Sequence, residues 1–232
     1  MKQMSLAPAG FELVTKRTRK PEFLDEMNLV IPWSELFSLI APRAPTGKTS
    51  GPPLATEVTL RIHLLQQFFG HSDPAMEEVL HDIPLCQEFA HMDAGMIRFP
   101  DESIILRFRH ILDAQGIGQQ ILATVNAKLI HRGLMSKAGT VMDVTLIAAP
   151  SSIKNNKGER DPERHQTKKS NPWHFGVKAH IGVGAELGLV HKVTTTVASV
   201  HDITHEHALQ HENEEVFFAD SGYREVEKRE EI

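Results

Sequence analysis

Apolar residues between residues 20 and 135 recur at the three- and four-residue steps that line one face of a helix. The clearest run stops at Gly70, and glycine commonly terminates a helix because it tolerates a left-handed backbone. The pattern predicts an amphipathic helix before this glycine, with an apolar face formed by Leu54, Val58, Ile62, Leu65 and Phe69.

Further helices are predicted from their boundaries. Ser72 followed by Pro74 is typical of a helix start, because serine caps the first amide groups and proline fits the first turn. Asp101 is expected to open another helix as a capping residue. A third helix carries apolar residues from Ile117 onward and is expected to stop at Gly133.

The pattern changes after Gly139, where β-branched and apolar residues replace the helical spacing. Thr140–Ala148 is predicted to be a buried strand. A polar loop is expected over 150–172. It is followed by two strands, His174–Val183 and Leu189–Ala198, which glycines connect as an antiparallel pair.

A short helix over His201–His211 and a strand over Glu215–Ala219 complete the pattern. This half of the chain therefore reads as three strands, a helix and a fourth strand. If the first and fourth strands are parallel neighbours, then Asp143 and Asp220 stand side by side.

Both aspartates have an ordinary explanation beside the functional one. A carboxylate such as Asp143 in an apolar strand is costly unless it is paired, binds a metal or faces solvent on an edge strand. Asp220 could simply cap a following helix. Together, however, the two form a set of hard oxygen ligands that suits Mg²⁺ or Mn²⁺ in phosphodiester chemistry.

The composition is that of an ordinary globular protein, with 41% hydrophobic and 24% charged residues in a chain of 232. Its one cysteine, Cys86, excludes an internal disulfide and fits a reducing cytoplasm. No apolar run approaches the roughly 18 residues that a membrane helix needs. The basic patch near the N-terminus is not followed by the apolar region of a signal peptide. We therefore expect a cytoplasmic protein without a membrane partner.

The formal net charge of −5 would disfavour a nucleic-acid partner if the charges were evenly spread. They are not, because Glu212–Ile232 contains eight acidic and three basic residues. Residues 16–20 are locally basic, and Lys154–Lys169 holds six basic residues against three acidic ones. Such patches attract phosphates, although a solvated loop explains a basic cluster equally well.

Six longer motifs carry a resemblance to a known family. Two lie in the first half, RIHLLQQFFGHSDPAMEEVL and FPDESIILRFRHIL. Four lie in the second half, TVMDVTLIAAPSSIKN, RDPERHQTKKSNPWHFGVKAHIGV, GLVHKVTTTVASVHDIT and FFADSGYREVEKREE. In this order, from about Arg17 to the end, they make the chain closely similar to the insertion-sequence-five family of bacterial DDE transposases.

The resemblance implies an α + α/β fold, in which a helical domain precedes an incomplete ribonuclease H-like mixed-sheet domain. The expected boundaries are a basic arm at 1–20, a helical domain at 21–135 and a truncated catalytic domain at 136–232. In this family the aspartates that match Asp143 and Asp220 are the first two catalytic acids and hold Mg²⁺ or Mn²⁺. The implied function is metal-dependent DNA cleavage and strand transfer.

The resemblance also implies partners. These are double-stranded DNA, as terminal inverted repeats and as target, and a second transposase chain, through self-association or with full-length transposase. The protein is then expected on the nucleoid. The basic loop would lie near the mouth of the active site, where the candidate phosphate contacts are Lys154, Arg160, Lys168 and Lys169.

The sequence departs from the family after Asp220. The third catalytic residue of such enzymes is a glutamate on a helix far downstream, and the sequence ends at Ile232 before that helix. We therefore expect a truncated or frameshifted copy that does not catalyse transposition alone. The alternative is a non-catalytic DNA-binding protein that regulates or inhibits transposition.

Two other features have competing interpretations. Trp173 could stack on bases or wedge between them, although a role as the anchor of a small core is the simpler interpretation. A cluster of histidines suggests a zinc hydrolase, but its spacing matches that pattern only weakly. Its members are His201, His205, His207 and His211.

Overall fold

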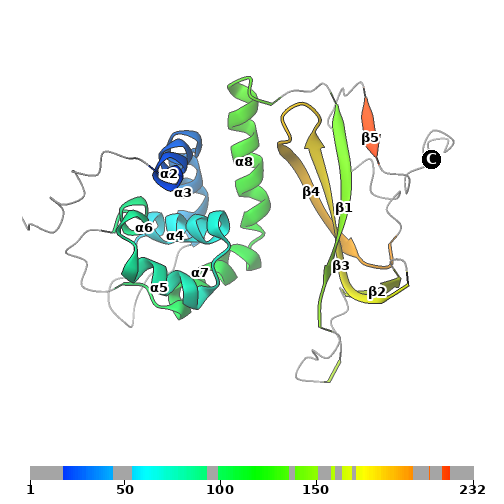
Figure 1. Ribbon diagram of the computed structural model, residues 1–232, viewed down its shortest axis with the longest axis horizontal. Helices are drawn as coiled ribbons and strands as arrows, with labels where there is room; N and C mark the ends of the chain where they lie inside the picture. Colours follow the sequence, from blue (N-terminus) through cyan, green and yellow to red (C-terminus); the bar gives the residue numbers. More distant parts are fainter. Residues whose placement is uncertain are drawn as a thin grey trace, which may run out of the picture. The chain divides into compact units, whose positions relative to one another are not determined.

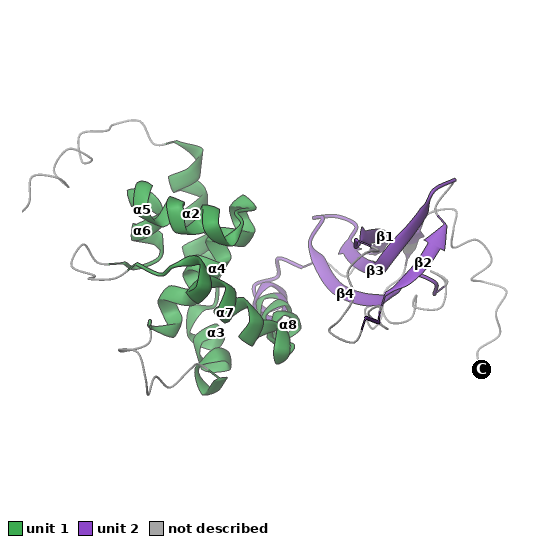
Figure 2. Ribbon diagram, turned by 90° about the horizontal axis from the view of Figure 1, so that it is seen from below, with its two compact units in different colours: residues 1–125 green, residues 126–232 purple. Residues whose placement is uncertain are grey.

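The computed structural model describes residues 18–43, 54–92, 99–135, 139–150, 158–159, 164–168, 171–200, 209 and 216–219. The chain forms two compact units, Met1–Val125 and Asn126–Ile232, coloured green and purple in Figure 2. The first is helical and the second contains a mixed sheet, which agrees with the predicted architecture. The division falls inside α8 (Ile117–His131), and the expected domain boundaries at 20 and 135 stay predictions.

The predicted helix boundaries in the first unit are confirmed where a capping residue defines them. The helix α4 (Thr56–Phe69) ends at Gly70, whose φ of 66° is the left-handed conformation that favours glycine. The next helix, α5 (Asp73–Asp82), begins after Ser72, whose hydroxyl accepts a hydrogen bond from the backbone amide of Ala75.

Two later helices follow the same rules. The carboxylate of Asp101 accepts a hydrogen bond from the amide of Ile104 and caps α7 (Glu102–Ala114). Gly133, with a φ of 68°, follows the end of α8. The other helices described in the first unit are α2 (Arg19–Val30), α3 (Trp33–Ile40), the 3-10 helix η1 (Ala41–Arg43) and α6 (Pro84–Phe89).

Helix α4 joins two apolar clusters that hold the helical unit together, because it presents apolar residues to both. One cluster contains Val58, Ile62, Leu65, Met76, Leu80, Cys86 and Ile105. The other contains Leu36, Ile40, Leu60, Phe108, Leu112 and Ile117. Burial of these side chains is the main stabilising contribution to the unit.

The second unit is a five-stranded mixed sheet in the described residues, ordered β2-β3-β1-β5 with β4 also pairing with β3 (Figure 1). The strand β1 (Thr140–Ala148) runs antiparallel to β3 (Trp173–Gly184) and parallel to β5 (Phe217–Ala219). β4 (Val190–Val197) pairs antiparallel with β3, as predicted. The expectation that the first and last strands are parallel neighbours is therefore confirmed.

The prediction of a polar loop over 150–172 is wrong at β2 (His165–Lys168), which pairs antiparallel with the start of β3. This strand carries no apolar alternation, because it lies at an edge of the sheet and is held by backbone pairing. The predicted helix His201–His211 lies outside the described residues except for Leu209, which is helical and fully buried.

Close packing of β1 on β3 depends on Gly176. A Cβ atom at this position would overlap the carbonyl oxygen of Ile147, so only glycine permits the pairing of Gly176 with Ala148 at the end of β1. A glycine at position 176 is therefore required for the register in which it lies opposite Ala148.

Alternation along β1 separates the two faces of the sheet. Thr140 and Met142 are buried on one face, whereas Val141, Asp143 and Ile147 lie on the exposed face. The prediction of a buried strand over Thr140–Ala148 is therefore wrong for one of its two faces, which is exposed.

Several polar side chains on the buried face are paired, although the buried hydroxyl of Thr194 has no hydrogen-bond partner among the described residues. The hydroxyl of Thr140 lies 2.8 Å from Nε2 of His191, and Nε2 of His180 lies 2.8 Å from the hydroxyl of Thr196. The side-chain amide of Asn126 donates to the carbonyl of His191 at 3.0 Å.

No helix in the described part of the chain has the length and hydrophobicity to span a membrane.

Candidate active site

Asp143 lies on the exposed face of β1, directly opposite Ile181 of β3. The strand β1 lies between β3 and β5 in the sheet, so Asp143 is not on an edge strand. The ordinary explanation of this residue is therefore right about solvent exposure and wrong about the edge. A carboxylate on an interior strand has a fixed backbone position, which suits a ligand-binding group.

A groove of about 400 Å³ runs along β1 beside this carboxylate. Asp143 is the acidic residue among those that line it, and within the described residues no hydrogen bond or ion pair engages its side chain. Its oxygens are therefore open to a ligand. The other lining residues are Val144, Thr145, Leu146, Ala148 and His174.

The pairing of β1 with β5 sets the approach of the second candidate acid. The described ladder ends where Met142 lies opposite Ala219. These two residues directly precede Asp143 and Asp220 in the sequence. Asp220 itself lies outside the described residues.

Two family models match the chain, one in each half. The first, "Transposase domain (DUF772)", matches residues 12–111, and the second, "Transposase DDE domain", matches residues 135–232. The chain belongs to the DDE transposases. Members of this family act on DNA and generally use divalent metal ions. Membership of the insertion-sequence-five branch stays a prediction, and no solved structure matches the chain significantly.

The predicted phosphate contacts of the transposase fall mostly outside the described residues, as Lys154, Arg160 and Lys169 do. Lys168 is described. It is the last residue of β2, its side chain is exposed, and it pairs directly with Trp173 at the start of β3. A cationic group therefore stands at the end of the β2–β3 hairpin.

The interpretation of Trp173 as a core anchor is wrong, because 68% of its surface is exposed. The ladder between β3 and β1 ends at Gly176, so β1 does not extend alongside Trp173. The only strand that pairs with this end of β3 among the described residues is β2, whose side chains are polar.

The zinc hypothesis is not tested by the transposase structure, since His201, His205, His207 and His211 lie outside the described residues. Within the described residues, no group of three or more histidine, cysteine or acidic side chains is placed to hold a metal ion. A metal at Asp143 would thus need a ligand from elsewhere in the chain.

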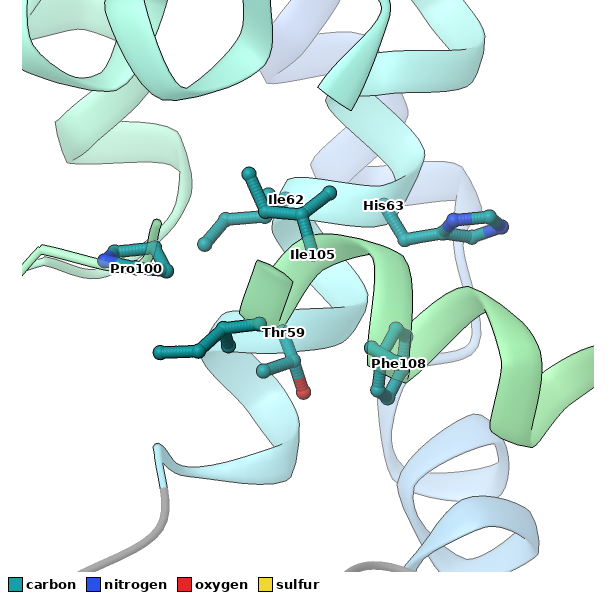
Figure 3. Close-up of a pocket in the computed structure, with 7 residues that line it drawn as sticks. Thr59, Ile62, His63, Pro100, Ile105 and Phe108 are labelled. Atoms are coloured by element: carbon teal, nitrogen blue, oxygen red, sulfur yellow. The ribbon is translucent and has the colours of Figure 1, made fainter. Parts of the chain in front are cut away.

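A cavity in the helical unit offers no competing site (Figure 3). It is lined mainly by Ile62, His63, Ile105 and Phe108 and provides about 10 Å³ of accessible space, roughly enough for one water molecule. Burial lowers the pKa of His63, an effect that Asp113 opposes and Arg109 reinforces. The cavity is a packing defect between α4 and α7 and has no room for a substrate.

Proposed function

We propose that this chain is a transposase for DNA cleavage and joining at the terminal inverted repeats of an insertion sequence, with Asp143 and Asp220 as paired metal-binding carboxylates, and that it does not catalyse strand transfer alone. The observation that carries the proposal is the parallel ladder of β1 and β5, which ends one residue before each aspartate. Continued by one pair, this register would bring the two residues opposite each other on strands about 4.8 Å apart.

The donor set fits a hard divalent cation. The Asp143 carboxylate is exposed in the groove along β1 and has no described partner, so its oxygens are free to coordinate. Carboxylate oxygens are the ligands that Mg²⁺ and Mn²⁺ prefer. When bound, such an ion supplies Lewis-acid activation of the phosphodiester and of the attacking oxygen.

The fold contributes a fixed position for the Asp143 carboxylate. The backbone of Asp143 is positioned by the pairing of β1 with β3. The preceding residue, Met142, is 3% exposed and anchors the strand on the covered face of the sheet. Movement of the carboxylate would therefore require movement of a packed strand. This rigidity is what a site for in-line attack at phosphorus needs, because small displacements of catalytic groups cost large factors in rate.

Binding of DNA would rely on cationic side chains. The proposed phosphate contacts are Lys154, Arg160, Lys168 and Lys169, which supply affinity but no base readout. Because two ends of an element must be brought together, we propose that the working form contains more than one transposase chain. A chain of this kind would be found on the nucleoid.

The metal site is tested by titrating the 232-residue chain with Mn²⁺ and following free Mn²⁺ by electron paramagnetic resonance. Wild type should bind Mn²⁺, and Asp143→Asn and Asp220→Asn should each weaken binding about ten-fold or more, because each removes a charged ligand. Glu186→Gln is the matched control, since Glu186 is an exposed acid in the turn between β3 and β4. Unchanged binding in both aspartate variants would contradict the proposal.

Catalysis needs a separate assay. The expectation that residues 1–232 do not catalyse strand transfer alone stays a prediction. It is checked with labelled inverted-repeat duplex and Mg²⁺, in which free 3′-hydroxyl ends report cleavage. Metal-dependent cleavage that Asp143→Asn abolishes would overturn that prediction and support the active site. Binding of the duplex without cleavage would favour the non-catalytic DNA-binding role.

A further inference from the structure

The exposure of Trp173 is unusual for so large an apolar side chain. The other tryptophan, Trp33, lies in the helical unit against the Arg61 guanidinium and the Phe37 ring. Trp173 has no aromatic or cation–π contact within the described residues, and 68% of its surface is open. Tryptophan is enriched among the residues that dominate binding interfaces, so an exposed tryptophan beside a cationic side chain is a candidate contact residue.

The charge around Trp173 points to an anionic partner. Lys168 is its direct cross-strand neighbour, so the two side chains project from the same face of the hairpin. From Arg164 to Ala185 the sequence contains four lysines and arginines and no acidic residue. This stretch of sequence therefore carries a positive charge, although the chain as a whole is negative, and Lys168 places one of its cations beside Trp173.

The side chains of Trp173 on β3 and Asp143 on β1 project from the same face of the sheet. Asp143 pairs with Ile181, and Trp173 lies eight residues before Ile181 on β3. Because side chains alternate along a strand, an even separation puts Trp173 on the same side as Asp143. At about 3.3 Å per residue the two levels are about 26 Å apart along the strand. This separation equals roughly eight base pairs of duplex.

We propose that the end of the β2–β3 hairpin is a DNA contact of the transposase, in which Trp173 stacks on a base exposed by duplex distortion and Lys168 binds the adjacent phosphate. A flat aromatic ring stacks on any base face, and a neighbouring cation holds the backbone in register. The position relative to the scissile phosphate rests on the proposed catalytic role of Asp143.

The test compares two probes at low salt, a fully paired 24-base-pair duplex and the same duplex with a two-base central bubble. Wild type should prefer the bubble, and its tryptophan emission should be quenched on binding. Trp173→Ala should lose about ten-fold in affinity for the bubble duplex and little for the paired one. Trp173→Phe should restore part of the preference, because phenylalanine can still stack.

Lys168→Ala separates the charge from the ring. It should weaken binding to both probes equally and lower the slope of log affinity against log salt by about one. Leu187→Ala is the matched control, since Leu187 is 59% exposed in the turn at the other end of β3. It should leave both affinities and the quenching unchanged.

Three results would overturn the inference. Trp173→Ala with an unchanged preference for the bubble would exclude stacking. A change in sedimentation of Trp173→Ala without a change in DNA affinity would show that the ring contacts protein. Failure of wild type to bind either probe would remove both this contact and the DNA-binding part of the proposed function, whereas the first two results leave that function standing.

Discussion

The two units differ in whether their most notable side chains are enclosed by the fold or exposed to solvent. In the helical unit, Arg61 is 4% exposed and its guanidinium makes three hydrogen bonds. It donates to Glu57 at 3.2 Å, to the side-chain oxygen of Asn28 at 2.8 Å and to the carbonyl of Phe89 at 3.2 Å. It also stacks on the Trp33 ring at 3.8 Å. This group is buried and held by other residues of the helical unit.

A second closed network ties three helices of the same unit. The carboxylate of Asp73 at the start of α5 accepts two hydrogen bonds from Arg109 of α7, at 2.9 and 2.8 Å. It accepts another from Gln66 of α4 at 2.7 Å. Charge-assisted bonds of this geometry fix the crossing of the helices.

In the sheet unit, the side chains of the candidate site are exposed on one face of the sheet. Asp143 and Trp173 are exposed there, and no described contact engages the Asp143 carboxylate. On the covered face, by contrast, Thr140 is paired with His191. The comparison shows that the enclosed polar groups Arg61 and Asp73 are held by other residues of the fold, whereas the exposed Asp143 and Trp173 are the groups that we propose for metal and DNA.

The largest expected effect is a loss of stability in the sheet that carries Asp143 and Trp173. Gly176→Ala should destabilise the β1–β3 pair by about 3 kcal/mol, because the added methyl group overlaps the Ile147 carbonyl oxygen. Hydrogen exchange of the β1 and β3 amides, followed by mass spectrometry, measures the local loss. The amides of α4 should keep their protection, because the helical unit has its own core.

Gly184→Ala provides the control at the other end of β3. A Cβ there would lie 3.7 Å from the carbonyl oxygen of Leu189, which is ordinary contact. It should change exchange only slightly. Equal effects of the two variants would mean that the close approach at Gly176 does not determine the pairing of β1 with β3.

The next effect opens the closed network of the helical unit. Arg61→Ala should lower the free energy of unfolding of that unit by about 2 kcal/mol, because it removes three hydrogen bonds and the stack on Trp33. Urea denaturation followed by tryptophan emission measures it. Arg61→Lys should recover little, since an ammonium cannot replace the planar fork. Full recovery by lysine would show that charge alone matters.

The smallest effect is a pH dependence from His63. Burial lowers its pKa below 6.5, so at neutral pH both the folded and the unfolded states hold a neutral ring. As pH falls through 6.5, the unfolded state binds a proton more readily, and stability is lost between that value and the lower pKa of the folded state. Asp113 and Asp73 reduce this loss, and Arg109 adds to it.

The measurement compares wild type with His63→Gln in urea titrations at pH 7.5 and pH 5. Wild type should lose more stability than the variant over this interval, and the difference isolates His63 from the other histidines. Identical losses in the two proteins would mean that His63 is as accessible to protons in the folded state as in the unfolded state.

The helices could be predicted from the sequence because their ends are local. Gly70, Ser72 and Asp101 act within a few residues of themselves, and the structure confirms each boundary. The strand β2 could not be predicted in this way. His165–Lys168 has no apolar pattern, and its conformation depends on pairing with residues of β3.

The role of the predicted site residues stays a prediction, whereas the pairing of the strands that carry them can be compared with the structure. The aspartate motif identified Asp143, and the expected parallel pairing of its strand with β5 is confirmed. The exposure of Trp173 was missed because it depends on where β1 stops, which is a property of the whole sheet. The acid-free stretch up to Ala185 was a usable signal, since the basic loop was counted only to Lys169.

The burial of Cys86 in the core of the helical unit has a practical consequence for labelling. It is 5% exposed, and burial raises the pKa of its thiol, an effect that Lys20 opposes. Little of it is thiolate at neutral pH, so maleimide dyes react with it slowly. Because it is the one cysteine of the chain, a new cysteine at an exposed position such as Leu187 can be labelled selectively while the native thiol stays in place. Single-molecule distance measurements on DNA-bound transposase can therefore start from the natural sequence.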